Sequence, residues 1–171
     1  MKKFFLNLVF LFFLLGIFFF SPGAQGQIFL AEVEIEGMTC PFCNYGVEKV
    51  LDKVKGVKEV KVDLSKGIAI LNARPNQSIQ LEEIYPAIKK AGFTILSVKW
   101  SGQGKIQRSS KGEYYFKSKG EHHPIHVFNA AEMKKDLEIS LSENKPVKVS
   151  AIIRSVGKEY ICTQIVKMDI L

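Results

Sequence analysis

The stretch that decides the fold is Gly37-Met38-Thr39-Cys40-Pro41-Phe42-Cys43, which stands between two segments of different periodicity. Before it, residues 31–36 alternate apolar and acidic side chains, which is typical of a strand with one buried face. After it, apolar residues recur at intervals of three and four from Val47, which predicts a helix, and Gly56 is a stop signal. We therefore expect Cys40 in a loop and Cys43 in the first turn of a helix.

The same succession of periods continues to residue 100. Residues 60–64 alternate as a strand, and a short polar turn leads to a second strand at residues 68–71, which predicts a hairpin. Residues 81–91 return to helix period, and residues 94–100 read as a last strand. The order is βαββαβ, so residues 27–100 are predicted to form an α+β domain, the ferredoxin-like sandwich.

The two cysteines of the deciding stretch are spaced so that both thiols can face one point. The start of a helix presents free N–H groups and partial positive charge, which favour thiolate over thiol. Two thiolates suit a soft metal ion, and Cu(I) is the first candidate. Met38 is a weaker candidate ligand that we expect to pack under the loop instead. The sequence therefore predicts a soft-metal site made by Cys40 and Cys43.

Residues 29–99 resemble the heavy-metal-associated domain family, which includes copper chaperones, modules of metal-transporting ATPases and the periplasmic mercury-binding protein. The resemblance rests on residues 37–43, Val47, Leu51, Gly56-Val57 and Ala91-Gly92-Phe93. It implies that Cys40 and Cys43 bind near-linear Cu(I) or Hg(II), with Zn(II) as a further alternative. It also implies transfer by ligand exchange to or from a metal-donating or metal-accepting protein with its own Cys pair, and it places Phe93 close to the metal loop.

The first 26 residues have the pattern of an export signal. A positive start precedes an apolar run from Phe4 to Phe20, and small residues at Ala24 and Gly26 mark a cut before Gln27. The run is at the lower limit of what spans a bilayer, so an uncleaved membrane anchor is the alternative. Either way, the remainder is predicted to be periplasmic or otherwise extracytoplasmic, with membrane contact only if the segment stays uncleaved.

The C-terminal part has a different pattern. Ser101-Gly102-Gln103-Gly104 reads as a linker. Residues 105–171 contain several short alternating segments and one short helical segment ending near Leu137, which predicts a small mostly-β domain of unknown role. The length and spacing favour a small barrel, and we expect an OB-like one.

Three histidines and a third cysteine lie in this C-terminal part. His122, His123 and His126 fall within five residues, and they are interpreted either as a polar loop or as a second metal site. Cys162 sits in an alternating segment and is expected to be a small core residue.

Composition narrows the classes of function. The net charge is +7, but basic and acidic residues are interleaved, which argues against nucleic acid as a partner. Three cysteines are too few for a disulfide scaffold. No catalytic motif is recognisable, so the chain is not expected to be an enzyme.

Two rival interpretations stay open. A Cys-x-x-Cys outside the cytoplasm can be oxidised, so the first rival is a thiol–disulfide oxidoreductase that uses Cys40 and Cys43. The βαββαβ context differs from the one such a motif has in a thioredoxin-like domain, which weighs against it. The second rival is a partner-binding module whose metal site is vestigial.

Overall fold

The structure is a computed structural model that describes residues 27–118, 125–156 and 161–171. In chain order, its elements are β1 (Ile28–Glu36), α2 (Pro41–Leu51), β2 (Val57–Asp63), β3 (Ile68–Ala73), α3 (Leu81–Lys90), β4 (Thr94–Arg108), β5 (Tyr114–Lys117), β6 (Ile125–Val127), α4 (Lys134–Glu143), β7 (Val147–Val156) and β8 (Ile161–Ile170). The strands form one sheet that is shared by an N-terminal and a C-terminal region.

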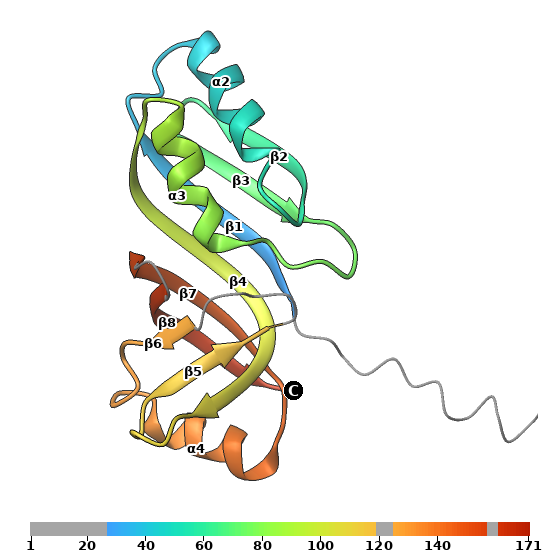
Figure 1. Cartoon of the computed structure of the whole chain (residues 1–171), viewed down its shortest axis with the longest axis vertical. Coiled ribbons are helices and arrows are strands. Elements are labelled where there is room, and N and C mark those ends of the chain that lie inside the picture. Colours follow the sequence, from blue (N-terminus) through green and yellow to red (C-terminus); the bar gives the residue numbers. More distant parts are fainter. Residues whose placement is uncertain (1–26, 119–124, 157–160) are drawn as a thin grey trace, which may run out of the picture.

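The N-terminal region has the predicted βαββαβ order. Its strands lie in the order β2-β3-β1-β4, and each neighbouring pair is antiparallel. The helices α2 and α3 cover one face of this sheet, as Figure 1 shows. Val33 of β1, Val47 of α2 and Ile84 of α3 are fully buried between the layers. The predicted ferredoxin-like sandwich is therefore confirmed, and its helix-period residues face the sheet.

The strand β4 continues through residues 101–104, which the sequence analysis assigned to a linker. It first pairs with β1 as far as Gly102, while residues 99–104 pair with β7 along the opposite edge, and residues 105–108 pair with β5. A Cβ atom on Gly104 would lie 2.3 Å from the carbonyl oxygen of Lys117. The glycine therefore permits a close approach of backbone inside a strand, which is a second use of glycine besides turns.

The C-terminal region is a closed barrel of β4, β5, β6, β8 and β7, in that order, and β7 returns to pair with β4. All neighbouring pairs are antiparallel except β6 and β8, which are parallel. The helix α4 connects β6 to β7 and lies at the end of the barrel away from α2 and α3 (Figure 1). The predicted mostly-β region is thus a barrel, and its OB-like character stays a prediction.

One hydrophobic core runs through both regions. Trp100 of β4 lies at the junction, where its register partners are Ala31 of β1 and Ala151 of β7. Its side chain is 1% exposed, and its ring centre is 5.2 Å from that of Phe116 in the barrel. The indole Nε1 donates a hydrogen bond of 3.1 Å to Oγ1 of Thr163. The two regions are therefore joined by packing as well as by the chain.

Candidate metal site at the start of α2

The site is formed where the loop after β1 becomes α2. Cys40 is the N-cap of α2 with an extended backbone, and Pro41 follows it in the first turn. Proline suits this position because its missing N–H has no intrahelical partner there. The backbone N–H of Cys43 donates to Sγ of Cys40 at 3.1 Å, so a sulfur takes the capping role that an oxygen usually has. The sequence order Cys-Pro-x-Cys thus sets the loop-to-helix transition itself.

The structure brings the two predicted cysteines together. Their Cα atoms are 5.2 Å apart, and their sulfurs are joined as a disulfide. Both side chains are half-buried at the N-terminus of α2. The first turn of α2 contains no acidic residue, and Lys49 lies in its last turn, so no carboxylate of the helix competes with thiolates for its positive end. The N-terminus of α2 therefore presents its partial positive charge to both sulfurs.

Two aromatic side chains beside the cysteines are exposed to solvent. Phe42, between the cysteines, is 89% exposed, and Tyr45, one turn on, is 66% exposed with the Lys49 ammonium 5.7 Å from its ring centre. Met38 is 3% exposed and belongs to the core, as predicted. Phe93 is half-buried and packs against the same core. A metal ion at the thiols would therefore be reached past exposed aromatic side chains, and the buried Met38 side chain faces the core.

The remaining candidate ligands lie in the barrel. His122 and His123 fall outside the described residues. His126 lies on β6, where its ring packs edge-on against that of Tyr115 with centres 4.4 Å apart. Among the described residues, no three side chains of His, Cys, Asp or Glu gather as a metal site. The structure therefore shows one cysteine pair at α2 and places His126 in a separate region.

Cys162 does not belong to the core, contrary to the expectation. It is half-exposed on β8, whereas its neighbours Ile161 and Thr163 are fully buried. Alternation along β8 leaves two choices of inward face, and the inward one carries Ile161, Thr163 and Ile165. Cys162 consequently lies on the outer face of the barrel.

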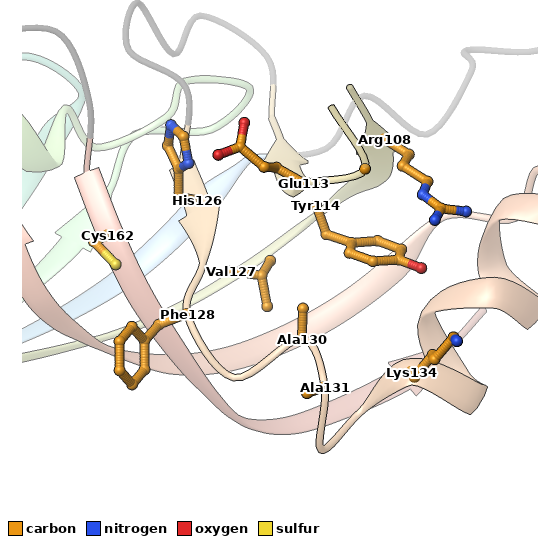
Figure 2. Close-up of a pocket in the computed structure, with 11 residues that line it drawn as sticks. Arg108, Glu113, Tyr114, His126, Val127, Phe128, Ala130, Ala131, Lys134 and Cys162 are labelled. Atoms are coloured by element: carbon orange, nitrogen blue, oxygen red, sulfur yellow. The ribbon is translucent and has the colours of Figure 1, made fainter. Parts of the chain in front are cut away.

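A cavity on the barrel was not predicted from the sequence. It has a volume of about 450 Å³ and is shown in Figure 2. On one side, Arg108 pairs with Glu138 at 3.3 Å, and Tyr114 donates a hydrogen bond to the same carboxylate, which raises the pKa of Tyr114. The lining comes from four separate segments, so no local motif could have indicated it. Its residues are Arg108, Gly112, Glu113, Tyr114, His126, Val127, Phe128, Ala130, Ala131, Lys134 and Cys162.

The predicted export segment lies outside the described residues. Within residues 27–118, 125–156 and 161–171, none of the helices has the length and apolar character needed to cross a membrane. The prediction of a signal peptide in residues 1–26 therefore rests on the sequence pattern.

Comparison with protein families matches residues 32–94 to the heavy-metal-associated domain. Among curated proteins, a copper-transporting ATPase of Helicobacter felis is 41% identical over 63 residues, which are 37% of this chain and 8% of that protein. Human copper-transporting ATPase 2 is 33% identical over 79 residues, which are 43% of this chain and 5% of that protein. The chain thus spans less than a tenth of the length of these relatives.

Solved structures are also similar over the N-terminal region. A copper-binding domain from HMA7, a P-type ATPase, is 35% identical with a TM-score of 0.35, and the match covers 40% of this chain and 95% of that one. Oxidized MerP from Ralstonia metallidurans CH34 is 25% identical with a TM-score of 0.35, and the match covers 42% of this chain and 97% of that one.

Proposed function

Residues 32–94 belong to the heavy-metal-associated domain family, and from this premise we propose that the chain binds Cu(I) through Cys40 and Cys43 and passes it on or sequesters it by ligand exchange. The observation that carries the proposal is the meeting of the two sulfurs at the N-terminus of α2. Soft thiolates select Cu(I) among the common cellular metal ions. Hg(II) is another soft ion that paired thiolates bind, and Zn(II) is the less suitable alternative because it takes four ligands.

In this proposal, transfer of the metal ion to a partner is possible because only two protein ligands hold the ion. Two sulfurs leave an ion open to a third, so a thiolate of a partner can bind before Cys40 or Cys43 leaves, with no change of oxidation state. A tetrahedral site of four cysteines would be closed to such an attack. The partner that fits this step is a metal-donating or metal-accepting protein with its own Cys pair, and Phe42 and Tyr45 are the exposed side chains that it meets first.

Metal binding in this proposal requires the reduced site. In the disulfide between Cys40 and Cys43 neither sulfur is a thiolate, so two electrons and a reductant must be supplied before a metal ion can bind. The pair lies in an extracytoplasmic compartment if residues 1–26 direct export, and disulfides persist there. We infer that the oxidised pair is a resting state of the site and that the chain is not an enzyme.

The barrel is assigned as OB-like within the same proposal. Five strands close it, and β6 and β8 are its parallel pair, with α4 inserted between β6 and β7. The OB-fold is a five-stranded, partly open Greek-key barrel, so the number of strands supports this proposal.

One observation favours a second candidate function. The Cys40–Cys43 disulfide is accessible beside exposed aromatic side chains, which is also what a thiol–disulfide oxidoreductase requires. The two functions differ in the expected activity, because an oxidoreductase turns over substrate disulfides and a metal-binding protein does not. A partner-binding module with a vestigial site predicts neither activity.

The test is a titration of the reduced full chain with Cu(I) against a chromophoric Cu(I) chelator. We expect the Cys40→Ser and Cys43→Ser variants to lose the most tightly bound Cu(I), with a fall in affinity of more than about tenfold. Even the loss of a residue that only hydrogen-bonds to a metal ligand lowers metal affinity by about tenfold or more. Phe42→Ala is the matched control, because this side chain lies between the cysteines and is not a ligand.

Two outcomes would contradict the proposal. Retention of the tightest Cu(I) in both cysteine variants would show that the ligands are elsewhere. Turnover of insulin disulfides by the wild-type chain, with loss in the same variants, would favour the oxidoreductase.

A further inference from the structure

His126 and Cys162 are direct neighbours on the outer face of the barrel. The parallel strands β6 and β8 pair in a register that sets His126 opposite Cys162. In-register residues of paired strands point to the same face. That face is the outer one, because the residues on either side of each are buried: Ile125, Val127, Ile161 and Thr163. An imidazole and a thiol therefore stand side by side on two rigid strands.

Both side chains line the cavity of about 450 Å³ described above. In Figure 2 the imidazole of His126 lies toward Glu113, while the thiol of Cys162 lies nearer Phe128. Both residues are half-exposed, so a rotation about the Cα–Cβ bond of Cys162 is not blocked by core packing. Cys162 is not in a disulfide, so no covalent bond occupies its sulfur.

From this arrangement we propose that His126 and Cys162 form a second soft-metal site, which binds one Cu(I) on the barrel independently of Cys40 and Cys43. Paired strands lie about 4.8 Å apart. A metal ion bound linearly between a nitrogen at about 2.0 Å and a sulfur at about 2.3 Å spans about 4.3 Å, taking the known zinc distances as a guide. Side chains that leave the same face of neighbouring strands at this backbone spacing can be brought to such a span by rotation about their Cα–Cβ bonds, so one ion can bridge His126 and Cys162.

The number of ligands decides which metal fits. No third His, Cys, Asp or Glu completes a site among the described residues, so an ion that needs four protein ligands is disfavoured. Thiolate selects Cu(I), and imidazole also suits copper. The ring of Tyr115 packs edge-on against the imidazole at 4.4 Å, which restricts the positions that this ligand can take. The site is thus a two-ligand site for a soft monovalent ion.

The experiment uses the full chain with Cys40→Ser and Cys43→Ser, reduced and without air, so that only the barrel site is measured. Titration with Cu(I) against a chromophoric chelator is expected to show about one bound ion, held by the thiolate–imidazole pair. Adding Cys162→Ser, or adding His126→Ala, should each lower the affinity by more than about tenfold. X-ray absorption of the bound copper should show one sulfur and one nitrogen neighbour.

The matched control is Gln164→Ala, which changes the next residue on the same outer face of β8 and should leave binding unchanged. The combined variant His122→Ala and His123→Ala should also retain the ion. The proposal is overturned if the protein lacking Cys40 and Cys43 binds no Cu(I), or if it keeps Cu(I) after both Cys162→Ser and His126→Ala. This experiment uses a chain without Cys40 and Cys43, so its result does not depend on whether those residues bind Cu(I). The site at α2 is tested separately, by comparing the wild-type chain with its cysteine variants.

Discussion

The two regions of the molecule place a glycine with a close backbone contact in different kinds of element. Gly56, in the N-terminal region, has a φ of +87° and joins α2 to β2, where an added Cβ would meet the backbone oxygen of Ser78 at 2.0 Å. Gly104, in the barrel, lies inside β4 and is not one of the glycines with a positive φ. An added Cβ would nevertheless meet the backbone oxygen of Lys117 at 2.3 Å. Both glycines permit a close approach of backbone, but Gly56 lies in the turn before β2 whereas Gly104 lies inside a strand. A glycine in a sequence therefore does not by itself mark a boundary.

The same contrast holds for the functional groups of the two regions. Cys40 and Cys43 are three residues apart and meet because a helix begins between them. His126 and Cys162 are 36 positions apart in number and meet because β6 and β8 pair. The first arrangement is local, whereas the second depends on the closed barrel. The predictions below test whether the regions depend on one another and on these contacts.

The largest loss of stability is expected for Trp100→Ala, because the Trp100 side chain fills the junction between the two regions. Truncating a buried aromatic side chain costs about 3–5 kcal/mol of unfolding free energy. Chemical denaturation followed by far-UV circular dichroism should show a lower midpoint and a single transition, since β4 belongs to both regions of the one sheet. Trp100→Phe is the control that keeps most of the volume. Two well-separated transitions in the wild-type chain would show that the regions unfold independently.

The next effect concerns Gly104→Ala. The new methyl group would meet the backbone of Lys117 and the ring of Phe116. We expect this overpacking to lower the free energy of unfolding by about 3 kcal/mol. Gly46→Ala is the matched control, because nothing lies within 4 Å of a Cβ there and α2 gains about 0.5–1 kcal/mol from the better helix former. The measurement is urea denaturation of both variants. Equal stability of the two would refute the close-approach explanation.

A smaller effect is expected for Thr163→Val. The hydroxyl accepts from Nε1 of Trp100 at 3.1 Å and donates to the carbonyl oxygen of Ile152 at 2.9 Å. Valine keeps the shape but leaves the buried indole N–H without an acceptor, which costs about 2 kcal/mol. Thermal denaturation should rank wild type, then Thr163→Ser, then Thr163→Val. A Val variant as stable as the Ser variant would show that the hydrogen bond is unimportant.

The smallest effect concerns the hairpin turn after β2. Oδ1 of Asp63 accepts hydrogen bonds from the hydroxyl and backbone N–H of Ser65 and from the backbone of Lys66, and the Ser65 hydroxyl chiefly lowers the pKa of Asp63. A lowered pKa in the folded state means that the carboxylate stabilises the fold above its ordinary value of 3.8 and loses this effect as the pH falls below it. Asp63→Asn should therefore be slightly less stable than wild type at neutral pH, and the gap should close in strong acid. A constant gap in melting temperature across pH would contradict this.

Sequence patterns predicted the N-terminal region well because its signals are local. The helix at residues 41–51 is marked by a capping residue, a proline and apolar spacing, all within the helix itself. The pairing of the two thiols follows from that helix start. Nothing beyond a dozen neighbouring residues was needed for either inference.

The barrel was predicted only in outline because its closure depends on distant pairs. Alternation in residues 161–165 could not decide which face is inward, so Cys162 was assigned to the core. The cavity joins residues from β4, the turn into β5, the segment from β6 to the start of α4, and β8, and no local pattern indicates that these segments meet. Gly102 and Gly104 were read as a linker because a close approach is visible only when the opposing strand is known.

The continuity of β4 has a consequence for any protein that meets this one. A flexible tether between two modules would let the thiol pair sample many positions, and each encounter would carry the entropy cost of finding the right one. Here fifteen residues of a single strand run from beside α2 to the far rim of the barrel. A protein bound to the barrel would therefore have the two sulfurs at a fixed distance and direction from its binding site.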